Sequence, residues 1–132
     1  MKYLIDTHTF FWAVFDPDRL GTKARTILRD PNYVIYMSAV SFWEISLKYA
    51  IGKLELFSIL PDQFPEVARR MEFEILNLSP QEAATFYKLP KVGHQDPFDR
   101  MIIWQAIHQK MVLISKDKQF KLYKEIGLKV VW

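Results

Sequence analysis

Five short runs of apolar and β-branched residues, separated by longer segments with helical signals, constrain most strongly what this 132-residue chain can fold into. Strands that are apolar on both faces are typical of a parallel sheet, because helices cover such a sheet on both sides. The runs predict five strands, at Lys2–Ile5, Val34–Met37, Phe73–Leu78, Val112–Ser115 and Leu128–Trp132.

The segments between these runs predict helices. Ser79, Pro80 and Glu82 form a capping box with proline at the first helical position, and Gly127 suits a helix end. We expect helices at Thr22–Arg29, Ser41–Ile51, Pro61–Met71, Pro80–Lys88, Pro97–Lys110 and Lys118–Ile126. Alternating strands and helices predict an α/β fold, a three-layer sandwich with a central, mostly parallel five-stranded sheet. No repeat or linker divides the chain, so we expect residues 1–132 to form a single domain.

The composition excludes several kinds of protein. The chain has no cysteine, which excludes zinc–thiolate sites, redox pairs and thiol nucleophiles. Its longest uninterrupted apolar run, Phe10–Phe15, is far shorter than the roughly 18 residues of a membrane span. Asp6 and His8 interrupt the apolar residues near the N-terminus, so no signal-peptide core forms. We therefore expect a cytoplasmic protein that does not associate with membranes.

Positive charge gathers toward the C-terminus. Residues 108–132 contain six lysines and two acids, whereas the whole chain carries a net charge of +3. Lysines in this number can attract a polyanion such as RNA through its phosphates. They are also consistent with an ordinary solvated surface, so charge alone leaves both interpretations open.

Acidic residues follow two predicted strands at the edge where α/β folds bind their ligands. Asp6 comes directly after the first strand, and Asp117 comes shortly after the fourth. Because ligands gather beyond the carboxyl ends of parallel strands, the two side chains share one edge of the sheet if their strands are neighbours. Asp96 and Asp99 flank the start of a predicted helix, and Glu44 lies within an amphipathic helical segment beside aromatic residues.

Each of these acids has a structural alternative. Four of them lie where a helix N-cap or a first helical turn would also favour a carboxylate. Glu44 is spaced to pair with Lys48 at i, i+4 on the exposed face of its helix. Taken together, these alternatives require several separate coincidences at the edge where the fold class predicts a site.

Electrostatics favours a metal site over such coincidences. Two carboxylates ~4 Å apart repel by about 4 kcal/mol at an effective dielectric constant of ~20, so a cluster of them is unfavourable unless a cation neutralises it. Oxygen ligands suit Mg²⁺ or Mn²⁺, which proteins hold with carboxylates and substrate phosphates. This is the chemistry of metal-assisted phosphodiester hydrolysis.

Four segments of the chain resemble one known family. They are Y-L-I-D-T-H at residues 3–8, S-F-W-E-I-S-L-K at residues 41–48 with G-K-L following, H-Q-D-P-F-D-R-M-I-I-W-Q-A at residues 94–106, and L-I-S-K-D at residues 113–117. In this order, over nearly the whole chain, they resemble the PIN domain and, more narrowly, the VapC-like toxin nucleases of type II toxin–antitoxin pairs.

The resemblance implies a Mg²⁺- or Mn²⁺-dependent endoribonuclease that is the toxin of such a pair. Asp6, Glu44, Asp99 and Asp117 match the family's four acids in that order, and are the expected catalytic residues. The first, third and fourth of these acids are the expected metal ligands. Ser115 occupies a small hydroxyl position that often precedes the fourth acid by two residues.

Other residues near the motifs are expected to support the acids or to contact substrate. Asp96 belongs to the H-x-D-P-F-D-R variant and is assigned a supporting role. His8, His94 and Arg100 flank acids and could contact substrate phosphate, although capping, packing and salt bridges are alternatives for them. Trp104 stands where the family usually has a small residue, and a serine–lysine pair replaces a commoner threonine-containing form before the last acid. Both departures affect the expected shape of the pocket.

The expected partners are an RNA substrate, a cognate antitoxin protein and a second copy of the chain. Phe10, Phe11, Trp12 and Phe15, if helical, spread over roughly 200° of the helix, so either a partner covers one face or the helix lies deep in the core. Two other functions stay open. One is a PIN-like module that binds RNA or protein without cutting. The other is a receiver-like phospho-acceptor domain, which fits poorly because residues 6–8 read Asp-Thr-His.

Overall fold

The computed structural model describes residues 1–93 and 95–132. At its centre, in this described part, is a five-stranded sheet in which every pairing is parallel. The strand order is β3-β2-β1-β4-β5, and the bounds are β1 Lys2–Ile5, β2 Val34–Ser38, β3 Glu74–Leu76, β4 Val112–Ile114 and β5 Lys129–Val131. The predicted α/β fold is confirmed.

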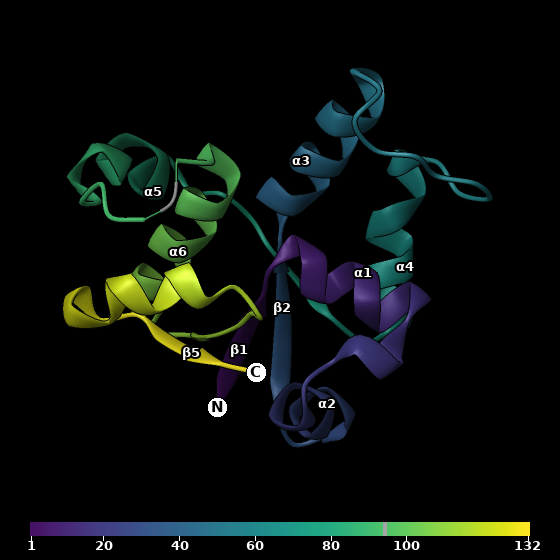
Figure 1. Ribbon diagram of the computed structural model, residues 1–132, viewed down its shortest axis with the longest axis horizontal. Helices are drawn as coiled ribbons and strands as arrows, with labels where there is room; N and C mark the ends of the chain where they lie inside the picture. The colour runs from purple at the N-terminus through teal and green to yellow at the C-terminus, as the bar shows by residue number, and fades with distance from the viewer. Residues whose placement is uncertain (94) are drawn as a thin grey trace.

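Helices flank the sheet on both sides (Figure 1). The α-helices are α1 Thr7–Phe15, α2 Thr22–Arg29, α3 Ala39–Ala50, α4 Phe64–Arg70, α5 Pro80–Thr85 and α6 Pro97–Gln109. The 3₁₀ segments are η1 Pro17–Arg19, η2 Pro61–Gln63, η3 Phe86–Lys88 and η4 Lys118–Ile126. No helix in the described part of the chain is both long and apolar enough to cross a membrane.

Strand β1 shows why three layers form. Its side chains alternate between the faces of the sheet, and both faces are buried. Ile5 packs into a core with Phe10 of α1 and Phe64 of α4, whereas Leu4 packs into a second core with Ile102 of α6. An apolar run without alternation is what a strand between two cores requires, so the prediction from the apolar run agrees with the packing.

The central position of β1 gathers several chain segments at one edge of the sheet. Ile5 is in register with Met37 of β2 and with Ile114 of β4. The residues that follow these strands therefore leave the sheet at the same level. Helices α1 and α3 and segment η4 all begin at this carboxyl edge.

Two predicted helices are interrupted, in both cases near a proline. The predicted helix Pro61–Met71 forms as η2 followed by α4, which starts anew with Pro65 in its first turn. A proline lacks the backbone N–H that a helix interior needs, so it is accepted only there. The predicted helix Pro80–Lys88 ends as the tighter η3, and Leu89 leaves it extended before Pro90.

The last predicted helix is a 3₁₀ helix. Phe120 and Tyr123 are its buried side chains, and their separation of three residues matches the three residues per turn of that helix. Gly127 ends the segment with a φ of 104°, a left-handed conformation that glycine adopts without strain.

Helix α1 is mainly a core helix. Of the two alternatives for its aromatic residues, a partner on one face or a position deep in the core, the second is correct. Phe10 is fully buried, and Phe11 packs on Phe64. Trp12 packs against Trp132 with ring centres 5.5 Å apart. Phe15 is 56% exposed, so this helix offers a large exposed apolar side chain at its last turn.

Candidate active site

Asp6 occupies the carboxyl end of β1 and caps helix α1. Its Oδ1 accepts a hydrogen bond of 2.9 Å from the backbone N–H of Thr9, and its Oδ2 accepts one of 2.5 Å from Ser115 Oγ. The side chain is buried. Burial raises the pKa of Asp6 above its usual value, although these hydrogen bonds act in the opposite direction. The capping alternative is therefore correct, and it does not remove the carboxylate from the site.

Ser115 connects Asp6 to Asp117. Its Oγ donates to Asp6 and accepts a hydrogen bond of 3.1 Å from the backbone N–H of Asp117. Asp117 in turn caps η4 by accepting a hydrogen bond of 2.9 Å from the backbone N–H of Gln119. One buried hydroxyl thus holds the first acid and the turn that carries the last one.

Glu44 is buried in α3 beside the start of α1. Its Oε1 accepts a hydrogen bond of 2.7 Å from Thr7 Oγ1, which also lies 2.9 Å from Ser41 Oγ. Its Oε2 pairs with Lys48, as the i, i+4 spacing predicts. Glu44 is only 5% exposed, so the structural alternative is correct about the pair with Lys48 and wrong about the exposed helix face. The hydrogen bond from Thr7 and the pair with Lys48 stabilise the charge of this buried acid.

Asp96 caps helix α6. Its Oδ1 accepts hydrogen bonds of 2.8 Å from the backbone N–H of Phe98 and 3.2 Å from that of Asp99. Its other oxygen lies 3.9 Å from Lys48 Nζ. Lys48 therefore links two acids of the site, a role that the sequence prediction did not assign to it. In the sequence, the i, i+4 spacing indicated the pair of Lys48 with Glu44, and no signal indicated its approach to Asp96.

Asp99 lies in the first turn of α6 among the other acids. Burial raises its pKa, and so do the negative charges of Asp96, Glu44, Asp6 and Asp117, in that order, to a value of about 7. Four carboxylates act on this one because folding brings α1, α3, α6 and η4 together. The site thus concentrates negative charge far beyond what its single ion-paired lysine offsets.

Three of the predicted acids line one cavity. It has a volume of about 270 Å³, and its walls are Asp6, His8, Trp12, Asp99, Lys116 and Asp117. Lys116 Nζ lies 5.5 Å from the centre of the Trp12 ring, and the His8 ring packs beside that tryptophan. Trp12 and Lys116 were not predicted as site residues, because only the fold places α1 beside the start of η4.

The oxygen donors of this cavity suit a hard divalent ion. Among residues 1–93 and 95–132, no three His, Asp or Glu side chains are close enough together to ligate one ion simultaneously. Carboxylates at ligand distance repel one another, so a cation would stabilise such a group. The donor chemistry and the raised pKa of Asp99 fit a cation site.

Other predicted residues lie elsewhere. Arg100 is buried and donates hydrogen bonds to the carbonyl oxygens of Leu89, at 3.0 Å, and Pro90, at 3.4 Å, so its guanidinium holds a loop. Trp104 Nε1 donates to Thr85 Oγ1 at 3.2 Å, toward α5. His94 lies outside the described residues.

Comparison with known proteins gives a family and a fold. The model of the PIN domain family matches residues 3–126. A curated relative, Ribonuclease VapC22 of Mycobacterium tuberculosis, is 24% identical over 129 residues, which are 98% of this chain and 97% of that protein.

Solved structures share the fold at low sequence identity. VapBC2 from Rickettsia felis, bound to a DNA fragment from its promoter, matches with a TM-score of 0.67 and 18% identity over 99% of this chain and 98% of that one. DNA-bound VapBC from Salmonella typhimurium matches with a TM-score of 0.62 and 20% identity over 99% and 97% of the chains. VapBC-1 from nontypeable Haemophilus influenzae matches with a TM-score of 0.60 and 20% identity over the same shares.

Proposed function

Because the chain belongs to the PIN domain family, we propose that it is a metal-dependent endoribonuclease and the toxin of a toxin–antitoxin pair. The observation that carries this proposal is the meeting of Asp6, Asp99 and Asp117 in one cavity. The similarity to a ribonuclease over nearly the whole chain supports the same activity.

Asp6, Asp99 and Asp117 would hold a Mg²⁺ or Mn²⁺ ion. When bound, this ion makes a water molecule more acidic and offsets the charge that develops on the scissile phosphate. The three carboxylates come from separate elements, so the folded chain sets their relative positions. The pKa of Asp99 is raised, and a neighbouring cation would favour its ionised form.

The remaining residues of the site position the acids and the substrate. Ser115 holds Asp6 in place through its hydroxyl. Glu44, held by Thr7 and Lys48, adds negative charge behind Asp99. His8 and Lys116 line the cavity and offer a hydrogen-bond donor and a positive charge to an RNA phosphate.

We assign three partners to the chain: an RNA substrate, a cognate antitoxin and a second copy in a homodimer. The antitoxin assignment follows from the resemblance to VapC-like toxins and from the VapBC assemblies that share the fold. The exposed aromatic side chains Phe15 and Trp43 offer apolar surface to protein partners. Cleavage of cellular RNA would place the activity in the cytoplasm.

The test is cleavage of single-stranded RNA by the purified protein with Mg²⁺ or Mn²⁺. We expect cleavage that stops with EDTA and is lost in Asp6→Asn and in Asp99→Asn. Asp62→Asn, an exposed acid of η2 outside the site, is the matched control and should retain the wild-type rate.

Two results would contradict the proposal. Metal-stimulated cleavage that both site variants retain would show that other residues or a contaminant cut the RNA. RNA binding without cleavage at any metal concentration would favour the non-catalytic module, which shares the same family. Membership of the PIN domain family sets aside the receiver-like alternative.

A further inference from the structure

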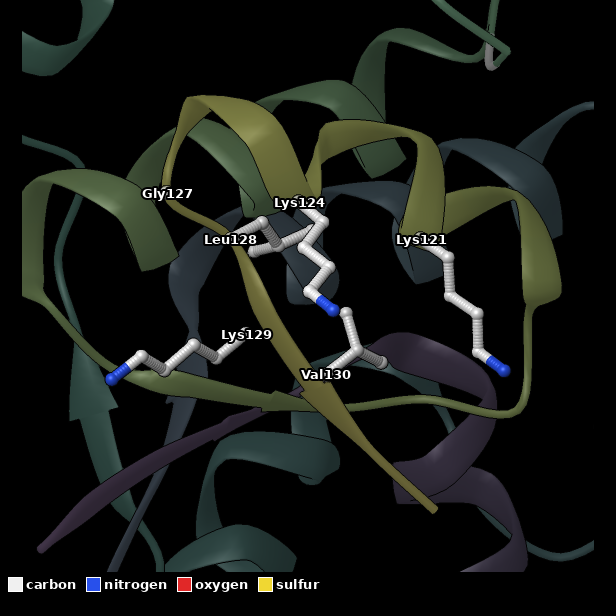
Figure 2. A pocket seen from close by; sticks show the side chains of 6 residues that line it. All are labelled: Lys121, Lys124, Gly127, Leu128, Lys129 and Val130. Atoms are coloured by element: carbon white, nitrogen blue, oxygen red, sulfur yellow. The ribbon is translucent and has the colours of Figure 1, made fainter.

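A second cavity lies between η4 and β5 (Figure 2). It has a volume of about 540 Å³ and is lined by Lys121, Lys124, Gly127, Leu128, Lys129 and Val130; we call it the lysine hollow. Figure 2 shows Lys124 extending from η4 toward Val130 of β5, Lys121 extending from a neighbouring turn of η4 on the same side of the strand, and Lys129 pointing away on the other side. The hollow therefore combines positive charge with a small apolar floor.

The lysines of the hollow form no close ion pair with an acid in the described part of the chain. Across residues 1–93 and 95–132, the side-chain ion pairs involve Arg19, Lys48, Arg69 and Arg70, and none of the three lysines of the hollow. Lys121, Lys124 and Lys129 are all exposed. Such a surface attracts an anion more strongly than one in which each lysine has a carboxylate partner.

Segment η4 connects the hollow to the acids. Asp117 caps its first turn and lines the acidic cavity, while Lys121 and Lys124 follow on the same segment. At about 2.0 Å of rise per residue, the two lysines lie roughly 8 and 14 Å along the axis from Asp117. Lys116, on the other side of Asp117, lines the acidic cavity itself. Positive charge thus extends from the acids along η4 as far as β5.

We propose that the lysine hollow binds backbone phosphates of a single-stranded RNA whose scissile phosphate lies at the acids. The inference rests on the proposed function and adds to it the path of the substrate. A strand that runs along η4 brings a phosphate to the acids and the next ones to the hollow. Lysines contact phosphates without reading bases, so this contact adds affinity and register but no sequence preference.

The experiment measures binding, separately from cleavage. In an Asp99→Asn background and with EDTA, the dissociation constant of a short fluorescein-labelled single-stranded RNA is measured over a range of salt concentrations. The variant K121Q/K124Q should bind about tenfold more weakly at low salt. The slope of log affinity against log salt should fall by about 1.4, as the loss of two phosphate contacts with a single strand predicts.

The matched control is K23Q/R29Q, which removes the same charge from exposed positions of α2. Because net charge falls equally, a loss confined to K121Q/K124Q supports a local contact and equal losses in both variants overturn it. Equal affinity of K121Q/K124Q and its parent also overturns the inference. Displacement of the RNA by a polyglutamate peptide of the same charge at the same concentration would overturn the assignment to nucleic acid.

Failure of the inference and failure of the proposed function are distinguishable. If the wild type cleaves RNA but the lysine variant binds normally, only the path along η4 is wrong. If the wild type binds RNA through the hollow but never cleaves it, the endoribonuclease proposal is wrong. The assignment of the lysine hollow as an RNA-binding surface is then still supported. Absence of RNA binding by the parent overturns the inference, whereas the endoribonuclease proposal is decided by the cleavage assay.

Discussion

Ser115 Oγ donates a hydrogen bond of 2.5 Å to Asp6 Oδ2 across 109 positions of the sequence. The bond exists because β1 and β4 are parallel neighbours, with Ile5 in register with Ile114. Asp6 and Ser115, which directly follow these two residues, therefore lie at the same level. The same hydroxyl accepts a hydrogen bond from the backbone N–H of Asp117. A single side chain therefore sets the relation between two proposed metal ligands.

Ser115→Ala should weaken both metal binding and cleavage. Loss of a group that orients a metal ligand typically costs ten- to a hundredfold in affinity or activity, and we expect a loss of about tenfold or more here. Mn²⁺ titration by calorimetry and RNA cleavage measure the two effects. Ser58→Ala, at an exposed loop position, is the control. Unchanged Mn²⁺ affinity in Ser115→Ala would show that Asp6 needs no orienting donor.

Asp99→Asn should abolish cleavage yet stabilise the metal-free fold. The folded-state pKa of Asp99 is raised from 3.8 to about 7, so the folded protein binds this proton more tightly than the unfolded chain. The ionised carboxylate therefore destabilises the fold above pH 7, by up to about 4 kcal/mol. This cost declines as pH falls from about 7 to about 4 and is absent below that.

Denaturant unfolding of both proteins in EDTA across this pH window checks the prediction. The variant should be the more stable protein above the pKa of Asp99, and the difference should vanish in acid. A variant that is less stable than the wild type at every pH would mean that Asp99 mainly complements the dipole of α6.

Asp96 should act through its cap more than through its charge. Asp96→Ala removes the acceptor for the N–H groups of Phe98 and Asp99, and should lower the free energy of unfolding by about 1 kcal/mol. Asp96→Ser keeps a capping oxygen without the charge, so it should retain the stability. Because Asp96 is the strongest charged influence on Asp99, both variants should also lower the pKa of Asp99. Carboxyl titration by NMR measures this shift, and an unmoved pKa would contradict it.

Local sequence signals predicted the elements and the separate acids. The apolar run at Lys2–Ile5 gave a strand with the observed bounds, and Asp96 before Pro97 gave the observed cap. These features depend on neighbouring residues only, such as a proline at the first helical position or a carboxylate next to free N–H groups. Motif order then indicated which acids belong to one site.

Features that depend on tertiary contacts were not predictable in this way. The burial of Glu44 follows from Thr7, which approaches it only when α1 and α3 leave adjacent strands. Trp104 was expected to alter the shape of the pocket. Its side chain instead faces α5, where its indole N–H donates a hydrogen bond to Thr85. Arg100 follows Asp99 in sequence, yet its position on the helix turns it toward the loop at Leu89. In each case the deciding partner is distant in the sequence.

Lys48 should stabilise the fold through Glu44. Lys48→Met leaves a buried carboxylate with Thr7 as its remaining donor, and should cost about 1–3 kcal/mol of unfolding free energy. Glu44→Gln alone should cost less, and the double variant should recover part of the loss of Lys48→Met. A double-mutant cycle by chemical denaturation gives the coupling energy. Strict additivity of the two single changes would contradict an interaction between these side chains.

Arg100 should affect stability and leave RNA binding unchanged. Its guanidinium is buried and donates to the carbonyl oxygens of Leu89 and Pro90, while the ring of Phe86 lies 5.3 Å away. Arg100→Met removes both hydrogen bonds, the one to the carbonyl of Leu89 being buried, and should lower the free energy of unfolding by about 2 kcal/mol. In the Asp99→Asn background, the affinity for a short labelled RNA and its salt dependence should match those of the parent at a temperature where both proteins are folded. A smaller salt slope with unchanged stability would instead place this arginine on a phosphate, since each lost phosphate contact reduces that slope by about 0.7.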